Sequence, residues 1–152
     1  MQNNCIKNLL NFKEVVIKNI KNLKDSVEVY AELLISEQTC PCCSTKTSKI
    51  HDHYVQPIKD IPIHLKPTTI YLRKTRYECP SCGKSFYPSN EVIARYNRKS
   101  TRLVDYIVDQ LRKNISASNI AKSLNIDSNF ISKLCTLSFC FYFFFASRSL
   151  YL

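Results

Sequence analysis

Apolar and polar residues alternate along one short segment near the start of the chain. Residues 27–33 place an apolar side chain at every second position, and residues 15–20 form a second run rich in β-branched residues. A period of two is typical of a strand with one buried face. Residues 22–25, between the two runs, predict a turn. We therefore expect residues 1–39 to form a β-hairpin-like N-terminal element.

The β pattern continues, with interruptions, as far as residue 88. Residues 50–54 and 68–77 are rich in aromatic and β-branched side chains and predict strands, while Pro57, Pro62 and Pro67 lie between them. Because proline lacks the N–H that a strand ladder uses, we expect these prolines to break the chain there. Few apolar residues remain for a separate core. Small β units of this kind are commonly stabilised by a bound metal, which contributes on the order of 10 kcal/mol or more.

The period changes to that of a helix from Ser100 onward. Apolar residues then recur every three or four positions, and Ser100 is a suitable N-cap for the helix that they predict. The residues of this apolar face are Leu103, Val104, Ile107, Val108 and Leu111.

Two more short helices are predicted within residues 116–134. Ser116 and Asp127 suit their N-caps, and Asn125 stands where a tight turn needs a positive φ, which asparagine tolerates. Ala121 is small enough to let the two helices cross closely. The other residues expected to face inward are Ile120, Leu124, Ile126, Ile131 and Leu134.

This arrangement of caps, turn and apolar spacing is that of a helix-turn-helix, which we place at residues 98–134. Two helices of an ordinary bundle would show the same apolar spacing, but the caps and the turn asparagine in register favour DNA binding. The residues expected to face the major groove or the phosphates are Ser128, Asn129, Ser132 and Lys133.

Two Cys-x-x-Cys pairs supply the candidate chemistry. Cys40 and Cys43 form the first pair, Cys79 and Cys82 the second, and a proline follows the leading cysteine of each. Such a turn presents two thiolates on one side of a tight loop, so two facing turns supply the four ligands of a tetrahedral metal site. Gly83 suits a left-handed backbone position after the second pair. We predict a four-cysteine domain at residues 40–90 that binds one Zn²⁺ per chain. The predicted fold class is α+β, a small β-rich zinc-ribbon-like domain followed by an all-α helix-turn-helix domain.

Other cysteines and histidines offer weaker alternatives. Cys42 lies inside the first pair, but the ligand spacing favours Cys40 and Cys43. His51 and His53 alternate along a predicted strand and could form a second metal site, although histidines on the surface beside a basic strand are the commoner case. The cysteines without a partner motif are Cys5, Cys135 and Cys140.

The charge of the chain favours a polyanionic partner. The formal net charge is +10, and residues 40–100 carry 11 basic and 4 acidic side chains. Nucleic acid is the usual partner of such a domain, and a merely solubilising surface is the alternative. No apolar signal segment opens the chain, so we expect a cytoplasmic location in which thiols bind metal rather than form disulfides. A single glycine excludes a glycine-rich phosphate loop, and no grouping of residues predicts a catalytic triad.

Residues 135–152 differ from the rest of the chain. Five of the seven residues 139–145 are phenylalanine. The segment is too short before Arg148 for a membrane span. Since the preceding chain is rich in Lys, Asn and Ile, a frameshifted and truncated end of an AT-rich gene is our interpretation.

Taken together, residues 10–134 resemble the N-terminal part of bacterial insertion-sequence transposases of the ISL-three group. The resemblance rests on the two cysteine pairs, the Asp60-Ile-Pro segment, the basic strand of residues 73–79 and the helices that follow. It implies a zinc domain and a helix-turn-helix that bind the terminal inverted repeats of double-stranded DNA. On the zinc domain, the residues expected to contact phosphates are Arg73, Lys74, Arg76 and Lys84.

The chain departs from this family in three places. Ser44 and Thr45 replace a glycine often found after the first pair, which predicts a less regular loop, and Thr75 replaces a common arginine. No Asp or Glu follows Asp127, so no two-metal carboxylate cluster can form downstream. We therefore expect a DNA-binding fragment associated with the nucleoid, without strand-transfer chemistry, that pairs with itself or with full-length transposase. The alternatives are a rubredoxin-like iron electron carrier and an independent zinc-containing transcriptional regulator.

Overall fold

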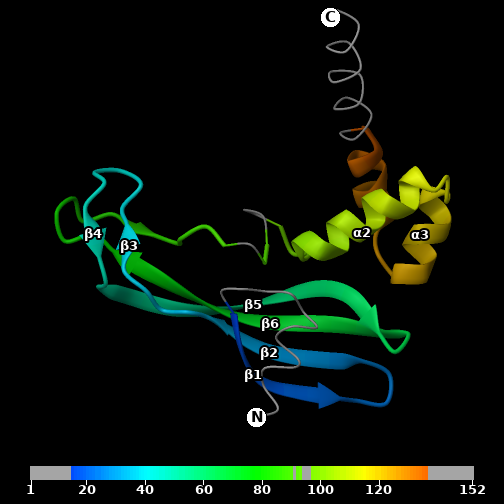
Figure 1. Cartoon of the computed structure of the whole chain (residues 1–152), viewed down its shortest axis with the longest axis horizontal. Helices are drawn as coiled ribbons and strands as arrows, with labels where there is room; N and C mark the ends of the chain where they lie inside the picture. The colour runs from blue at the N-terminus through cyan, green and yellow to red at the C-terminus, as the bar shows by residue number, and fades with distance from the viewer. Residues whose placement is uncertain (1–14, 91, 94–96, 137–152) are drawn as a thin grey trace, which may run out of the picture. The chain divides into compact units, whose positions relative to one another are not determined.

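The computed structural model describes residues 15–90, 92–93 and 97–136 (Figure 1). The chain divides into two compact units, Met1–Thr101 and Arg102–Leu152. The first holds a β-sheet and the second holds helices, which confirms the α+β class. Among the described residues no helix is both long and apolar enough to cross a membrane. The predictions for Cys5, Cys140 and the phenylalanine-rich segment from residue 137 onward fall outside the described residues.

Most strands of the first unit form one sheet in the order β1-β2-β6-β5, with β7 paired to β6. These strands are β1 (Val15–Asn22), β2 (Val27–Leu33), β5 (Ile50–Ile63), β6 (Lys66–Glu78) and β7 (Ser85–Phe86). Two further strands, β3 (Gln38–Thr39) and β4 (Lys46–Thr47), form a separate small pair. Figure 1 shows β3 and β4 at one end of this unit, beyond the main sheet.

The predicted N-terminal hairpin is confirmed. Strands β1 and β2 pair antiparallel, and the apolar residues of β2 are buried at every second position. Unexpectedly, β2 also pairs with β6 in parallel, with Val27 opposite Thr68 and Glu32 opposite Arg73. The hairpin therefore belongs to the same sheet as the strands that follow the cysteine pairs.

Strand β5 runs through Pro57 and Pro62, and Pro67 is the second residue of β6, so the prediction that these three prolines break the chain is wrong. Pro67 precedes Thr68, where the pairing of β6 with β2 begins. Strand β5 lies at an edge of the sheet, where a proline can leave its missing N–H on the unpaired side. A two-residue turn of His64 and Leu65, both with positive φ, joins β5 to β6. Positive φ at both central residues is the pattern of a type I′ hairpin turn.

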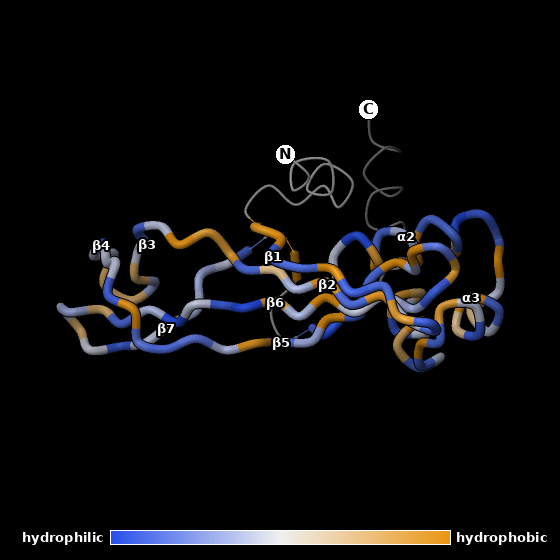
Figure 2. Tube along the Cα trace, turned by 90° about the horizontal axis from the view of Figure 1, so that it is seen from below, coloured by the Kyte–Doolittle hydropathy of each residue, from blue (hydrophilic) through white to orange (hydrophobic). Residues whose placement is uncertain are grey.

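One face of this sheet carries the core. The cluster takes side chains from all four long strands and from Val92 and Ile93, which cover that face: Val15, Ile17, Val27, Val29, Ala31, Leu33, Ile58, Ile70 and Leu72. The colour of β6 in Figure 2 is mixed, because its buried positions include the apolar Ile70 and Leu72 and the polar Thr68 and Thr75. The apolar residues of the β5–β6 hairpin are thus part of a core shared with β1 and β2.

Residues 97–101 lie along the free edge of β5. Lys59 N–H donates to the Arg98 carbonyl, and Ser100 N–H donates to the Lys59 carbonyl, both at 2.9 Å. Ser100, which immediately precedes α2 (Thr101–Arg112), is fully buried, and its hydroxyl donates to Asp60 Oδ1 at 2.6 Å. The start of the helix is therefore fixed to the Asp60-Ile-Pro segment.

The second unit contains α2, α3 (Ala117–Leu124) and a helix at residues 128–136. The predicted caps are confirmed, since Ser116 Oγ accepts from Asn119 N–H and Asp127 Oδ1 accepts from Asn129 N–H. Asn125 has φ 50° and ψ 51°, the predicted left-handed turn. The buried apolar side chains of the unit are Leu103, Ile107, Ile120, Ala121, Ile126 and Ile131.

Candidate metal centre

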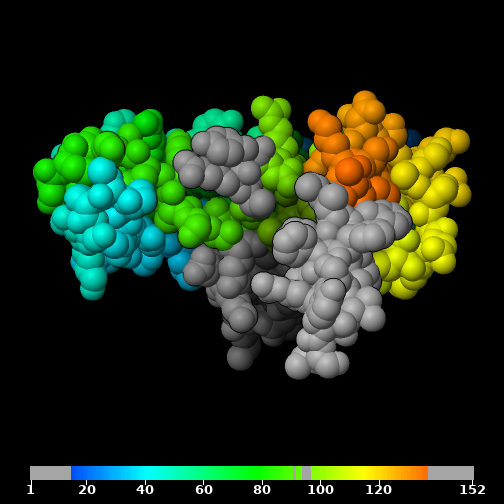
Figure 3. Space-filling model, turned by 90° about the horizontal axis from the view of Figure 1, so that it is seen from above, coloured from blue at the N-terminus to red at the C-terminus, as the bar shows by residue number. Residues whose placement is uncertain are grey.

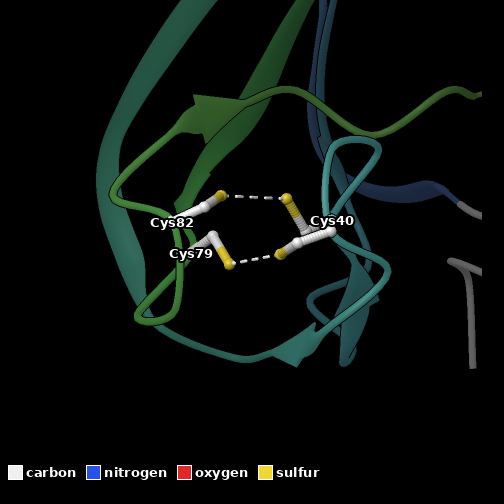
Figure 4. A group of neighbouring side chains, drawn as sticks. Cys40, Cys79 and Cys82 are labelled. Carbon is white, nitrogen blue, oxygen red and sulfur yellow. Dashed lines mark hydrogen bonds between the residues drawn. The ribbon is translucent and has the colours of Figure 1, made fainter.

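The four predicted cysteines converge, with their sulfur atoms all within 4.8 Å of one another. Cys40 Sγ lies 3.7 Å from Cys82 Sγ, and Cys43 Sγ lies 3.4 Å from Cys79 Sγ. Figure 4 shows the sulfurs pointing toward one another from two facing loops. In a tetrahedral zinc site with Zn–S bonds of about 2.3 Å, the sulfurs lie about 3.8 Å apart. The donor set and its spacing therefore fit one tetrahedral metal ion.

The first knuckle, residues 40–45, is a tight loop closed by its own backbone. Cys40 N–H donates to the Thr45 carbonyl at 2.9 Å, and Ser44 N–H donates to the Cys40 carbonyl at 3.0 Å. A backbone N–H, that of Cys42, also points at Cys40 Sγ from 3.5 Å. Such N–H groups favour the thiolate that a metal needs.

The second knuckle, residues 79–84, repeats this pattern. Cys79 N–H donates to the Lys84 carbonyl, and Gly83 N–H donates to the Cys79 carbonyl, both at 2.9 Å. Gly83 has φ 68° and Ser44, at the equivalent position, has φ 59°. The prediction of a less regular first loop is thus wrong, because Ser44 adopts the left-handed conformation that the glycine adopts.

This equivalence predicts opposite effects of two substitutions. Ser44→Gly should raise the free energy of unfolding of the metal-bound chain by about 1 kcal/mol, because glycine has no steric penalty at positive φ. Gly83→Ala should lower it by a similar amount, since a Cβ there would meet no atom within 4 Å and only the backbone conformation is penalised. Urea denaturation of both variants measures the difference, and equal effects of the same sign would contradict the shared loop geometry.

Side chains and backbone beneath the knuckles tie the two together. Thr47 on β4 is buried and donates its hydroxyl to the Glu78 carbonyl at 2.9 Å, while Glu78 N–H donates to the Lys49 carbonyl at 2.9 Å. Tyr77, 1% exposed, stacks on Phe86 of β7 with ring centroids 6.1 Å apart. Figure 3 shows the first knuckle (cyan) and the second (green) side by side.

Hydrogen bonds and neighbouring sulfurs set the protonation of the thiols. Backbone N–H groups, that of Cys43 foremost, lower the pKa of Cys40, and interaction with the Thr45 hydroxyl lowers the pKa of Cys43 to about 6. At Cys82 the Lys84 N–H favours the thiolate, but burial and hydrogen bonding among the sulfurs outweigh it and raise the pKa to about 12. The thiolate form of Cys82 is therefore favoured when a cation, such as a divalent metal ion, balances the negative charge of the four sulfurs.

The alternative metal ligands do not gather into a cluster within the described residues, where the four cysteines are the one group of suitable spacing. Cys42 is exposed, and hydrogen bonding to its sulfur raises the pKa of Lys84. His51 Nδ1 lies 3.3 Å from Asp52 Oδ2, whereas His53 Nδ1 lies 3.2 Å from the Thr75 hydroxyl.

The predicted phosphate contacts on β6 divide between two faces of the sheet. Lys74 and Arg76 lie on one face, with Lys74 Nζ 5.4 Å and Arg76 Cζ 5.9 Å from the centre of the Tyr87 ring. We call these three residues the basic face. Lys74 Nζ also donates to Gln56 Oε1 at 2.9 Å, and partial burial lowers the pKa of Lys74. Arg73 points to the opposite face, where its guanidinium lies 3.6 Å from Glu32.

The remaining predicted contacts lie on exposed positions of the second knuckle and the last helix. Lys84 is exposed in the knuckle, and the exposed helix residues are Ser128, Asn129, Ser132 and Lys133. Ser132 donates its hydroxyl to the Ser128 carbonyl at 3.1 Å, which uses its proton within the helix. Tyr87 is not among the predicted site residues, and the signal for it is an aromatic residue directly after the second knuckle and β7.

Comparison with known proteins gives a match for the segment that contains the four cysteines. No curated protein and no solved structure matches the chain. A family model does match, over residues 36–82, and its family is the zinc finger of transposases IS204/IS1001/IS1096/IS1165. The matched segment includes all four clustered cysteines, and the helices lie outside it. In sequence and in the position of its four thiols, the segment of residues 36–82 is thus similar to the zinc finger of this transposase family.

Proposed function

We propose that the chain is a DNA-binding part of an insertion-sequence transposase. The convergence of Cys40, Cys43, Cys79 and Cys82 within a segment similar to a transposase zinc finger carries the proposal. In this proposal the four thiolates hold one Zn²⁺ per chain. The role of the ion is structural, because four protein ligands fill its tetrahedral coordination and leave no position for a substrate.

The basic face and Lys84 would contact the phosphates of a DNA duplex. Lys74 and Arg76 point to the same side of β6, and the Tyr87 ring against them limits their motion. Cations held in this way neutralise phosphates and give affinity without sequence preference. Because Arg73 points to the other face and is paired with Glu32, we leave it out of this duplex surface.

The three helices would act as a helix-turn-helix domain, with the helix of residues 128–136 in the major groove. Asn129 lies in its first turn on an exposed position, and Ser132 and Lys133 follow one turn later. The amide of asparagine can make paired hydrogen bonds to adenine, whereas the Ser132 proton is already used within the helix. Asn129 is thus the proposed base contact, with Ser128 and Lys133 near the phosphates.

The proposed target is the terminal inverted repeat of the mobile element. The proposal concerns recognition of this target by the described residues and assigns them no strand cutting or joining. Binding at element ends would place the protein with the nucleoid and would allow it to pair with itself or with a full-length transposase.

The test is a binding titration of the zinc-loaded chain on two duplexes, one selected from a randomised pool and one scrambled. Asn129→Ala should cost roughly 1–3 kcal/mol on the selected duplex and almost nothing on the scrambled one. Lys74→Gln should weaken both equally and reduce the slope of log K against log salt by about one.

The matched control is Lys24→Gln, an exposed lysine in the β1–β2 turn at the far end of the sheet from the knuckles, which should leave both affinities unchanged. Failure of the pool to yield an enriched sequence, together with wild-type salt dependence in Lys74→Gln, would disprove the proposed function.

A further inference from the structure

The sheet face opposite the core carries two tyrosines in a fixed arrangement. Tyr30 on β2 and Tyr71 on β6 are register partners, and their rings stack with centroids 5.1 Å apart and planes 14° from parallel. Both hydroxyls donate to the same carboxylate, Tyr30 to Glu28 Oε2 at 2.9 Å and Tyr71 to Glu28 Oε1 at 3.5 Å. The negative charge of Glu28 raises the pKa of Tyr71, which keeps its proton. The two rings are therefore held in place before any ligand arrives.

A hollow of about 330 Å³ lies beside these rings. We call it the tyrosine hollow; its lining residues are Lys18, Tyr30, Ala31, Glu32, Val55, Tyr71 and Arg73. Ala31 belongs to the core on the other face, so the side chains on the side of the hollow are aromatic or charged apart from that of Val55.

The charges around the hollow leave a positive excess. Glu32 lies 3.1 Å from Lys18 Nζ and 3.6 Å from the Arg73 guanidinium, so one carboxylate faces two cations. Lys21 is a third cation, and its Nζ lies 5.0 Å from the centre of the Tyr30 ring. Glu28, which accepts the hydrogen bond from the Tyr30 hydroxyl, is the second carboxylate. Three cations thus surround two carboxylates, and the Glu32 ion pairs are partly exposed and able to exchange partners.

We infer that the tyrosine hollow binds an unpaired nucleotide of a nucleic acid strand. The base would pack against the tyrosine rings, and its phosphate would bind Lys18 and Arg73. Base stacking on aromatic side chains tolerates any base, because every base has a π-face. A hollow of this volume lies at the small end of ligand sites, which suits one planar base. A protein partner would need roughly 800 Å² of surface on this side alone, whereas the hollow is a small depression lined by seven residues.

This inference rests on the proposed function, since both take nucleic acid as the ligand, yet the two sites are separate. The basic face and the tyrosine hollow lie on opposite faces of β6, because Lys74 and Arg76 alternate with Tyr71 and Arg73 along the strand. A duplex on the basic face would leave the hollow accessible. The chain could then bind a duplex and an adjoining unpaired strand at once.

The test compares a fluorescein-labelled oligothymidylate with a blunt-ended duplex of two separate strands, each titrated with the zinc-loaded full chain by fluorescence anisotropy. Tyr71→Leu should weaken binding of the oligothymidylate by about 5- to 150-fold, the equivalent of one lost stacking contact, and should leave duplex binding within about twofold. Tyr71→Phe, which keeps the ring, should retain oligothymidylate binding. Arg73→Gln should weaken oligothymidylate binding and lower its salt dependence.

Tyr54→Leu is the matched control, since Tyr54 is an exposed tyrosine on the opposite face, at the register position of Lys74. It should leave oligothymidylate binding unchanged.

Wild-type oligothymidylate affinity in both Tyr71→Leu and Arg73→Gln would overturn the inference. A change in sedimentation of Tyr71→Leu without a change in oligothymidylate binding would overturn it too, and would identify this face as an interface between copies of the chain. If Lys74→Gln binds the duplex as the unsubstituted chain does, while Tyr71→Leu and Arg73→Gln lose oligothymidylate affinity, the proposed duplex site is wrong and the inference about the tyrosine hollow is still supported.

Discussion

The Cys79→Ser chain is expected to retain no zinc after desalting, whereas the unsubstituted chain retains one zinc per molecule. Cys79 is fully buried and its sulfur lies 3.4 Å from that of Cys43, so a serine there leaves only three thiolates at the site. Structural zinc sites of this kind contribute on the order of 10–16 kcal/mol to the folded state. Both knuckles should lose their order, which elemental analysis and amide hydrogen exchange of residues 40–45 and 79–84 would measure.

The rest of the sheet should survive the loss of metal. Its core takes residues from β1, β2, β5 and β6 together with Val92 and Ile93, and includes no residue of the knuckles. We therefore expect a cooperative unfolding transition and a strand signal in circular dichroism to remain in Cys79→Ser.

Cys42→Ser provides the matched control, because Cys42 lies in the first knuckle, is exposed and is outside the sulfur cluster. It should bind zinc as the unsubstituted chain does. Full zinc occupancy in Cys79→Ser would refute the ligand assignment. Bound iron with visible absorption in the unsubstituted chain would instead support the electron-carrier alternative.

Ile131→Ala should lower the free energy of unfolding of the helical unit by about 2–5 kcal/mol. Ile131 lies in the helix of residues 128–136 with none of its surface exposed, so the shorter side chain leaves a cavity. Urea denaturation followed by the helical signal measures the loss. Zinc content should not change, because the four ligands belong to the other compact unit.

The comparison variant is Lys133→Ala, an exposed position two residues further along the same helix. Surface substitutions of this kind usually change stability by less than about 0.5 kcal/mol. Equal stability of the two variants would show that this helix does not pack through Ile131.

Local signals predicted the local structure well. Apolar alternation located β2 and a run of β-branched residues located β1, and the caps at Ser116 and Asp127 and the turn at Asn125 lie where side-chain chemistry placed them. These features depend on a few neighbouring residues, so the sequence contains all that determines them. The same holds for each Cys-x-x-Cys turn, which closes on its own backbone.

Features that depend on distant partners were not predicted. A proline ends a strand only where its N–H is needed, and the place of Pro57 at the sheet edge follows from the order of the strands. The pairing of β2 with β6 brings Tyr30 to Tyr71 and Glu32 to Arg73 across more than 40 positions of sequence. Arg73, Lys74 and Arg76 form one basic run in the sequence, yet strand alternation assigns them to two faces.

The edge formed by β5 also bears on whether a second chain can pair with the sheet. An open strand edge is a template for pairing with another chain and for aggregation. Here Pro57 and Pro62 remove two donors from that strand, and residues 98–100 occupy both backbone groups of Lys59. A second molecule therefore finds neither a continuous row of donors nor a bare edge at β5. The Ser100 hydroxyl bond to Asp60 holds this covering segment on β5, so its loss would expose more of the edge to pairing with a second chain.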